Sequence, residues 1–69
     1  MAELEPRSAA QIIETAFEDR VRDLFKLFAE SVYTGEPEAA SAARFRRGLD
    51  SAKRVRVMAL ALAQELEGG

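Results

Sequence analysis

Small and apolar residues in the second half of the chain recur at alternating steps of four and three. The positions in this series are Ser41, Phe45, Gly48, Ala52, Val55, Ala59, Leu62 and Leu66. This spacing is a heptad repeat, which lines its members along one side of an α-helix and is not produced by a strand. Half of the members are small, and the distance between packed helices follows side-chain size at the contact. The pattern therefore predicts a long helix with a close partner helix.

A second helical pattern occupies the first half of the chain. Its apolar residues step by three and four: Ala10, Ile13, Phe17, Val21, Leu24, Phe28 and Val32. Neighbouring Ala9, Ala16, Phe25 and Leu27 widen this face to roughly half the helix circumference, more than a helix needs to contact one neighbour. Ser8 and Gln11 have the spacing of a capping box, so we expect the first helix to begin there.

The two patterns are separated by Thr34-Gly35-Glu36-Pro37. Gly35 suits the left-handed position that ends a helix, and Pro37 suits the first position of the next helix. We therefore predict a disordered tail at 1–7, a helix at 8–34, a turn at 35–36 and a helix at 37–67. A connection this short makes the helices antiparallel neighbours, which places Gly48 near Leu24 and Phe45 near Leu27.

The segment from Val57 to Ala63 is apolar nearly all the way round, which is typical of a helix buried on several sides. A chain of 69 residues rarely builds a sufficient core alone, and it contains no Cys or His for disulfides or the usual zinc sites. The sequence thus predicts an all-α fold: an antiparallel two-helix hairpin that associates into a four-helix bundle. A homodimer with Rop-like architecture is the simplest form, by comparison of architecture alone, and a tetramer remains open.

The residues predicted to form the oligomer interface are drawn from both helical patterns and include large and small side chains. They are Phe17, Leu24, Phe28, Phe45, Gly48, Ala52, Val55, Ala59 and Leu62. Two alternatives for the apolar segment are a groove for an amphipathic partner helix and shallow contact with a membrane. Membrane contact is disfavoured because the cations of the chain do not flank this segment.

Positive charge is concentrated in the second helix. Between Arg44 and Arg56 there are six cations and a single acid, Asp50, although the whole chain has a net charge of −2. Four of the cations fall on one arc opposite the heptad repeat: Arg46, Arg47, Lys53 and Arg54. This arc is a candidate contact for nucleic-acid phosphates or for an acidic protein. The competing interpretation is ion pairing with Glu14, Glu18 or Asp19, and no aromatic residue lies between Arg46 and Arg54 to stack bases.

Catalytic chemistry is disfavoured by the residue types present. The chain has no His or Cys, so its serines lack the usual activating base, and its isolated glycines form no phosphate-binding loop. Glu14 and Glu18 are spaced to hold a divalent ion in principle, but contact with solvent or with arginines is the simpler interpretation. We therefore expect a protein that is not an enzyme and has no cofactor, metal or small-molecule substrate.

The sequence also bears on location. Residues 1–6 lack the features of a signal peptide, and the longest uncharged apolar run, 57–63, is far shorter than the roughly 20 residues that span a bilayer. With the absence of Cys, this predicts a cytoplasmic protein without a membrane partner. Our function hypothesis is a self-associating interaction or scaffold module. The alternative is a small nucleic-acid-binding protein that uses Arg46, Arg47, Lys53 and Arg54.

Overall fold

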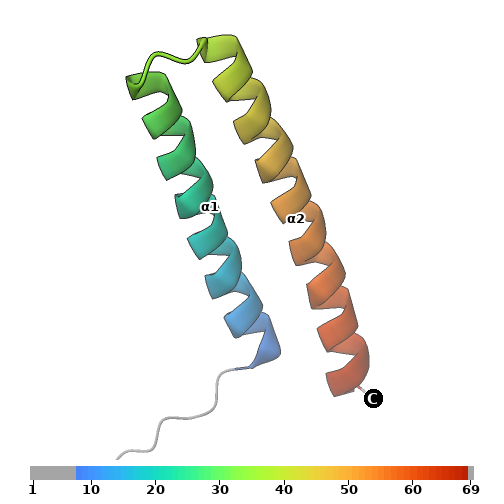
Figure 1. The fold of residues 1–69 in the computed structure, drawn as a ribbon. Coiled ribbons are helices and arrows are strands. Elements are labelled where there is room, and N and C mark those ends of the chain that lie inside the picture. Colours follow the sequence, from blue (N-terminus) through green and yellow to red (C-terminus); the bar gives the residue numbers. More distant parts are fainter. Residues whose placement is uncertain (1–7, 69) are drawn as a thin grey trace, which may run out of the picture.

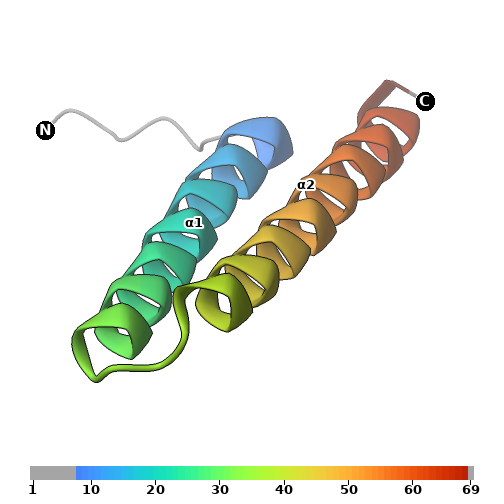
Figure 2. The same ribbon diagram turned by 90° about the horizontal axis from the view of Figure 1, so that it is seen from above.

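The computed structural model describes residues 8–68, which form two antiparallel α-helices joined by a short turn (Figure 1). Helix α1 covers Ala9–Tyr33 and helix α2 covers Glu38–Gly68. Figure 2 shows the helices side by side in a single layer, and the Cα trace is only 7 Å thick along its shortest axis. The fold is therefore all-α, as predicted, and both broad faces of the hairpin are open. The predicted tail at 1–7 lies outside the described residues.

The start of α1 is fixed by the predicted capping box. The Oγ of Ser8 accepts a hydrogen bond from the backbone N–H of Gln11 at 3.1 Å, and the Oε1 of Gln11 accepts one from the backbone N–H of Ser8 at 3.0 Å. These two bonds satisfy N–H groups that would otherwise lack partners at the first turn. Ser8 is thus the cap, and α1 begins one residue later than its predicted start.

The turn ends α1 with a Schellman motif centred on Gly35. The N–H of Gly35 donates to the carbonyl of Val32, and the N–H of Glu36 donates to the carbonyl of Ser31. Gly35 has a φ of 94°, a left-handed backbone conformation that residues other than glycine rarely adopt. Pro37 was expected at the first position of α2. It lies one residue earlier instead, where its carbonyl accepts bonds from Ala40 and Ser41.

The helices approach each other closely where α2 carries the small residues Ser41 and Gly48. Ser41 is 1% exposed and Leu24 is 7% exposed, and an ideal Cβ on Gly48 would lie 2.6 Å from Cδ2 of Leu24. The predicted proximity of Gly48 and Leu24 is therefore confirmed. The rings of Phe45 and Phe28 pack in a tilted arrangement with centroids 5.2 Å apart, one residue beyond the position expected from the simple register.

The contact line along α2 departs from the heptad series after Ala52. Within the hairpin, the half-buried positions continue through Arg56, Leu60 and Ala63 and include Ala59 of the heptad series, whereas Val55 is 62% exposed and Leu62 is 56% exposed. A straight α-helix drifts about 20° per heptad relative to a 3.5-residue repeat, so the two series separate over successive turns. Val55 and Leu62 therefore lie outside the contact between α1 and α2, and their place in an oligomer interface stays a prediction.

The core of the hairpin is very small. Leu24 is the one buried hydrophobic side chain among the described residues. Nine large apolar side chains are at least half exposed: Ile12, Phe25, Leu27, Tyr33, Val55, Val57, Met58, Leu62 and Leu66. A monomer in this conformation would leave at least half of each of these nine side chains in water.

Candidate functional site

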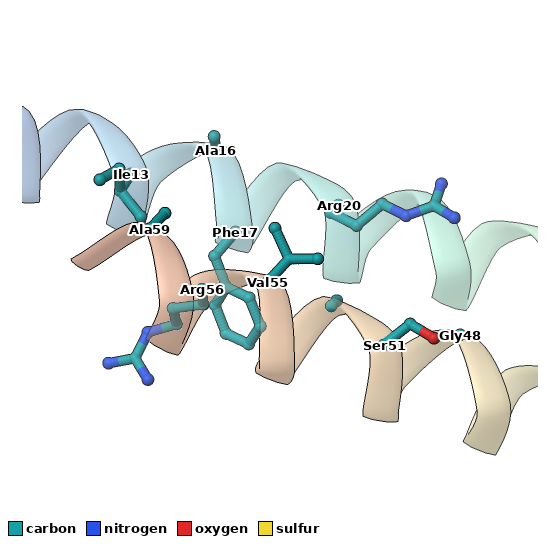
Figure 3. Close-up of a pocket in the computed structure, with 10 residues that line it drawn as sticks. Ile13, Ala16, Phe17, Arg20, Gly48, Ser51, Val55, Arg56 and Ala59 are labelled. Atoms are coloured by element: carbon teal, nitrogen blue, oxygen red, sulfur yellow. The ribbon is translucent and has the colours of Figure 1, made fainter. Parts of the chain in front are cut away.

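One broad face of the hairpin contains a groove of about 460 Å³ between the helices, and we call it the groove face (Figure 3). Phe17 and Val55 point into the space between the helices in this view. The other lining residues are Ile13, Ala16 and Arg20 from α1 and Gly48, Ser51, Ala52, Arg56 and Ala59 from α2. Most of these side chains are small, and they leave the space between the helices unfilled on this face.

Larger apolar residues border this groove near the open end of the hairpin, opposite the turn. Met58 and Leu62 follow Val55 at three and seven residues, which places all three on one stripe of α2. Met58 is 62% exposed, and Val55 and Leu62 are exposed to a similar degree. The groove and its border thus form a continuous apolar surface of the kind that marks an interaction site on a small protein.

The opposite face, which we call the aromatic face, also carries apolar residues. A shallow hollow near the turn is lined by Phe25, Phe28, Ala29, Val32, Tyr33, Glu38 and Ala42. Phe28, Val32 and Ala42 are half-buried, and Phe25 is mostly exposed. Tyr33 is 85% exposed, so both faces carry exposed apolar side chains, and the groove face differs in the small residues that line its hollow.

Arg56 links the two helices. Its guanidinium donates two hydrogen bonds of 2.8 Å to the carboxylate of Glu14 and lies 5.3 Å from the ring centroid of Phe17. The bidentate bond holds the pKa of Glu14 below its usual value and raises the pKa of Arg56. Arg56 is not a member of the heptad series, which steps three residues from Ala52 to Val55. A step of four residues from Ala52, about one helical turn, predicts Arg56 at the contact.

A second polar cluster fastens the turn. The Oγ of Ser31 lies 2.7 Å from the Oγ of Ser41, which in turn lies 3.2 Å from Oε1 of Glu36. The same Glu36 oxygen accepts a hydrogen bond of 2.7 Å from Arg44, which lowers the pKa of Glu36. The buried hydroxyl of Ser41 is thereby satisfied, and the start of α2 is tied to the end of α1.

Acid should weaken the protein through these two carboxylates. Because folding lowers the pKa of Glu14 and Glu36, their stabilising effect is complete above the unfolded pKa of about 4.5 and is lost as the pH falls below it. We expect the melting temperature to drop between pH 5 and pH 3, and the drop should be smaller in Glu14→Gln. Glu18→Gln is the matched control, because Glu18 forms no ion pair within residues 8–68. Equal acid sensitivity of Glu14→Gln and wild type would contradict this account.

The predicted basic arc lies on the exposed side of α2, and its members differ in their contacts. Arg54 forms an ion pair with Asp50, whereas Arg46, Arg47 and Lys53 form none with the part of the chain that the structure describes. Of the acids proposed as partners, Glu14 binds Arg56 and Asp19 binds Arg22 at 3.0 Å. Three cations of the arc therefore have no ion pair within residues 8–68.

Residues 8–68 contain no group of three acidic, His or Cys side chains placed to hold a metal ion. Neither helix has a stretch long and apolar enough to cross a bilayer. No protein-family model matches the chain, and comparisons with curated proteins and with solved structures also found no match.

Proposed function

We propose that this chain is the subunit of a self-associating helical bundle that acts as a non-enzymatic interaction or scaffold module. The observation that supports this proposal is that the core is very small while much apolar surface is exposed. Leu24 alone is buried among the described hydrophobic residues, while Val55, Met58 and Leu62 are each more than half exposed beside the groove. Apolar surface of this extent favours burial against another helical surface.

The groove face has the size that a stable interface requires. Two adjacent helices are about 20 Å wide, and the helices overlap over about 40 Å of their length. The face thus offers roughly 800 Å² to a partner, the contribution of one subunit to an interface of standard size. The small residues along the groove would let the partner helices approach closely.

The proposal is tested by placing a charge on each side of α2. Val55→Asp puts a carboxylate into the groove face and should prevent association, because a buried unpaired charge is strongly unfavourable. Val57→Asp is the matched control: Val57 is 60% exposed, close to the 62% of Val55, but it lies two residues on and does not line the groove. The mass of each variant in solution is measured by light scattering.

We expect Val55→Asp to be monomeric and to lose much of its helical circular dichroism signal. Val57→Asp should keep the mass of the wild-type protein. Association that survives Val55→Asp unchanged would show that the groove face is not the interface.

A second candidate function is non-specific binding of nucleic acid. Arg46 and Lys53 favour it because they are exposed and have no ion-pair partner among the residues described. They lie two helical turns apart, and association would double their number on the bundle surface. Gel shifts with duplex DNA and RNA at low and moderate salt separate this function from the scaffold function.

A further inference from the structure

We infer that two copies of the chain pack groove face to groove face with their turns at the same end of the bundle, so that α1 of each lies over α2 of the other. The inference rests on the proposed self-association and adds its geometry. Two-fold symmetry allows one other face-to-face arrangement, with the turns at opposite ends and each helix over its own copy. The distribution of apolar and charged residues along the groove face distinguishes the two.

On α2 the large apolar residues of the groove face gather at the open end of the hairpin, whereas on α1 the exposed Leu27 continues the stripe of Arg20 toward the turn. Val55, Met58 and Leu62 lie on this half of α2, and Arg44 and Arg47 occupy the half near the turn. With the turns at the same end, the apolar half of one copy covers the apolar half of the other. With the turns at opposite ends, Met58 and Leu62 would face the arginines, which would bury charge against apolar surface.

Charges on the groove side of the two helices are complementary at equal height. Asp23 lies on the same stripe of α1 as the groove residue Arg20, and Arg47 lies one turn before the groove residue Ser51 on α2. Both are exposed, and neither forms an ion pair inside the described hairpin. Because Leu24 lies level with Gly48 in this antiparallel pair, their neighbours Asp23 and Arg47 lie within about 3 Å of the same height along the hairpin axis.

The same-end arrangement therefore places Asp23 of each copy over Arg47 of the other, and two-fold symmetry forms this pair twice. In the opposite-end arrangement α1 crosses its own copy near its midpoint. Arg20 lies there and lines the groove, so two like charges would meet. Apolar matching and charge matching thus favour the same geometry independently.

The relative position of the two turns gives a direct test. The chain contains no cysteine, so Ala39→Cys introduces a unique labelling site on an exposed position of α2 beside the turn. Spin labels there should be less than about 30 Å apart if the turns lie at one end. They should be more than about 40 Å apart if the turns lie at opposite ends, since each helix is about 40 Å long. Pulsed electron spin resonance on the labelled protein measures this distance.

Light scattering on the same sample keeps the two proposals separable. A monomeric mass would overturn the proposed self-association itself, whereas a dimer with the long distance would overturn only the same-end arrangement. A dimer with the short distance supports both.

Charge exchange tests the predicted pair. Asp23→Lys and Arg47→Glu should each weaken the dimer about tenfold, because two exposed pairs become repulsive, and the double variant should restore its affinity to within about twofold. Glu18→Lys is the control, because Glu18 is also exposed on α1 but does not line the groove, and it should leave the affinity nearly unchanged. A double variant as weak as the single variants would show that these residues do not face each other and would overturn the inference.

Discussion

Gly48→Leu is expected to unfold the protein, whereas Gly48→Ala should change its melting temperature only slightly. The reason is the close approach of α2 to Leu24. A Cβ atom on Gly48 would lie 2.6 Å from Cδ2 of Leu24, which is shorter than any ordinary van der Waals contact. Leu24 is 7% exposed and has little space to move away.

Two opposing effects set the outcome for Gly48→Ala. Replacing glycine by alanine inside a helix stabilises it by up to about 1 kcal/mol. Moving the end of the Leu24 side chain to admit one methyl group offsets part of that gain. The change in stability should therefore be small in either direction.

The larger side chain has no comparable compensation. Gly48→Leu adds three more carbon atoms at the same contact, and overpacking of this kind typically costs about 1–3 kcal/mol and occasionally more. A small bundle has only a few kcal/mol of stability in total. Thermal melts followed by circular dichroism should therefore show a loss of the folded state.

Ala43→Leu provides the matched control for added bulk. Ala43 is exposed on the same helix, so the same isobutyl group enters solvent and the melt should stay close to that of the wild type. If Gly48→Leu and Ala43→Leu melted alike, α2 would not approach Leu24 through Gly48 in solution.

Local signals in the sequence predict most of the hairpin because they act over only a few residues. Ser8 and Gln11 form their capping box with hydrogen bonds three residues apart, and Gly35 adopts the left-handed conformation expected after a helix. Once the turn is this short, antiparallel packing follows, and the contact between Gly48 and Leu24 comes with it. Helix α2 begins one residue after Pro37 and not at Pro37 itself, a difference typical of helix ends.

The exact contact line of α2 could not be predicted from spacing alone. The heptad series and the 3.6-residue series share Ser41, Phe45, Gly48 and Ala52, so they diverge only at Val55 and Arg56. Hydrophobicity favours Val55 for the contact inside the hairpin, but the 3.6-residue period of the helix brings Arg56 there, and Glu14 of α1 supplies a bidentate partner for its guanidinium. Such a pair between residues distant in the sequence has no local signature. Because Arg56 takes this position, Val55 is left exposed on the groove face.

No folded monomer should exist at micromolar concentration, which is the second prediction with a large effect. The hairpin is a single layer with one buried hydrophobic residue in its described part, and ordering each residue costs about 1–2 kcal/mol of conformational entropy. Burial of that small core cannot offset this cost. Stability must then come from association, and it must depend on protein concentration.

The most direct test is the mass of the wild-type protein in solution, measured by light scattering together with its melting temperature over a hundredfold range of concentration. The account predicts a mass of at least twice the chain mass of 7.6 kDa and a melting temperature that rises with concentration. A helical protein with the mass of one chain and a melting temperature independent of concentration would contradict it.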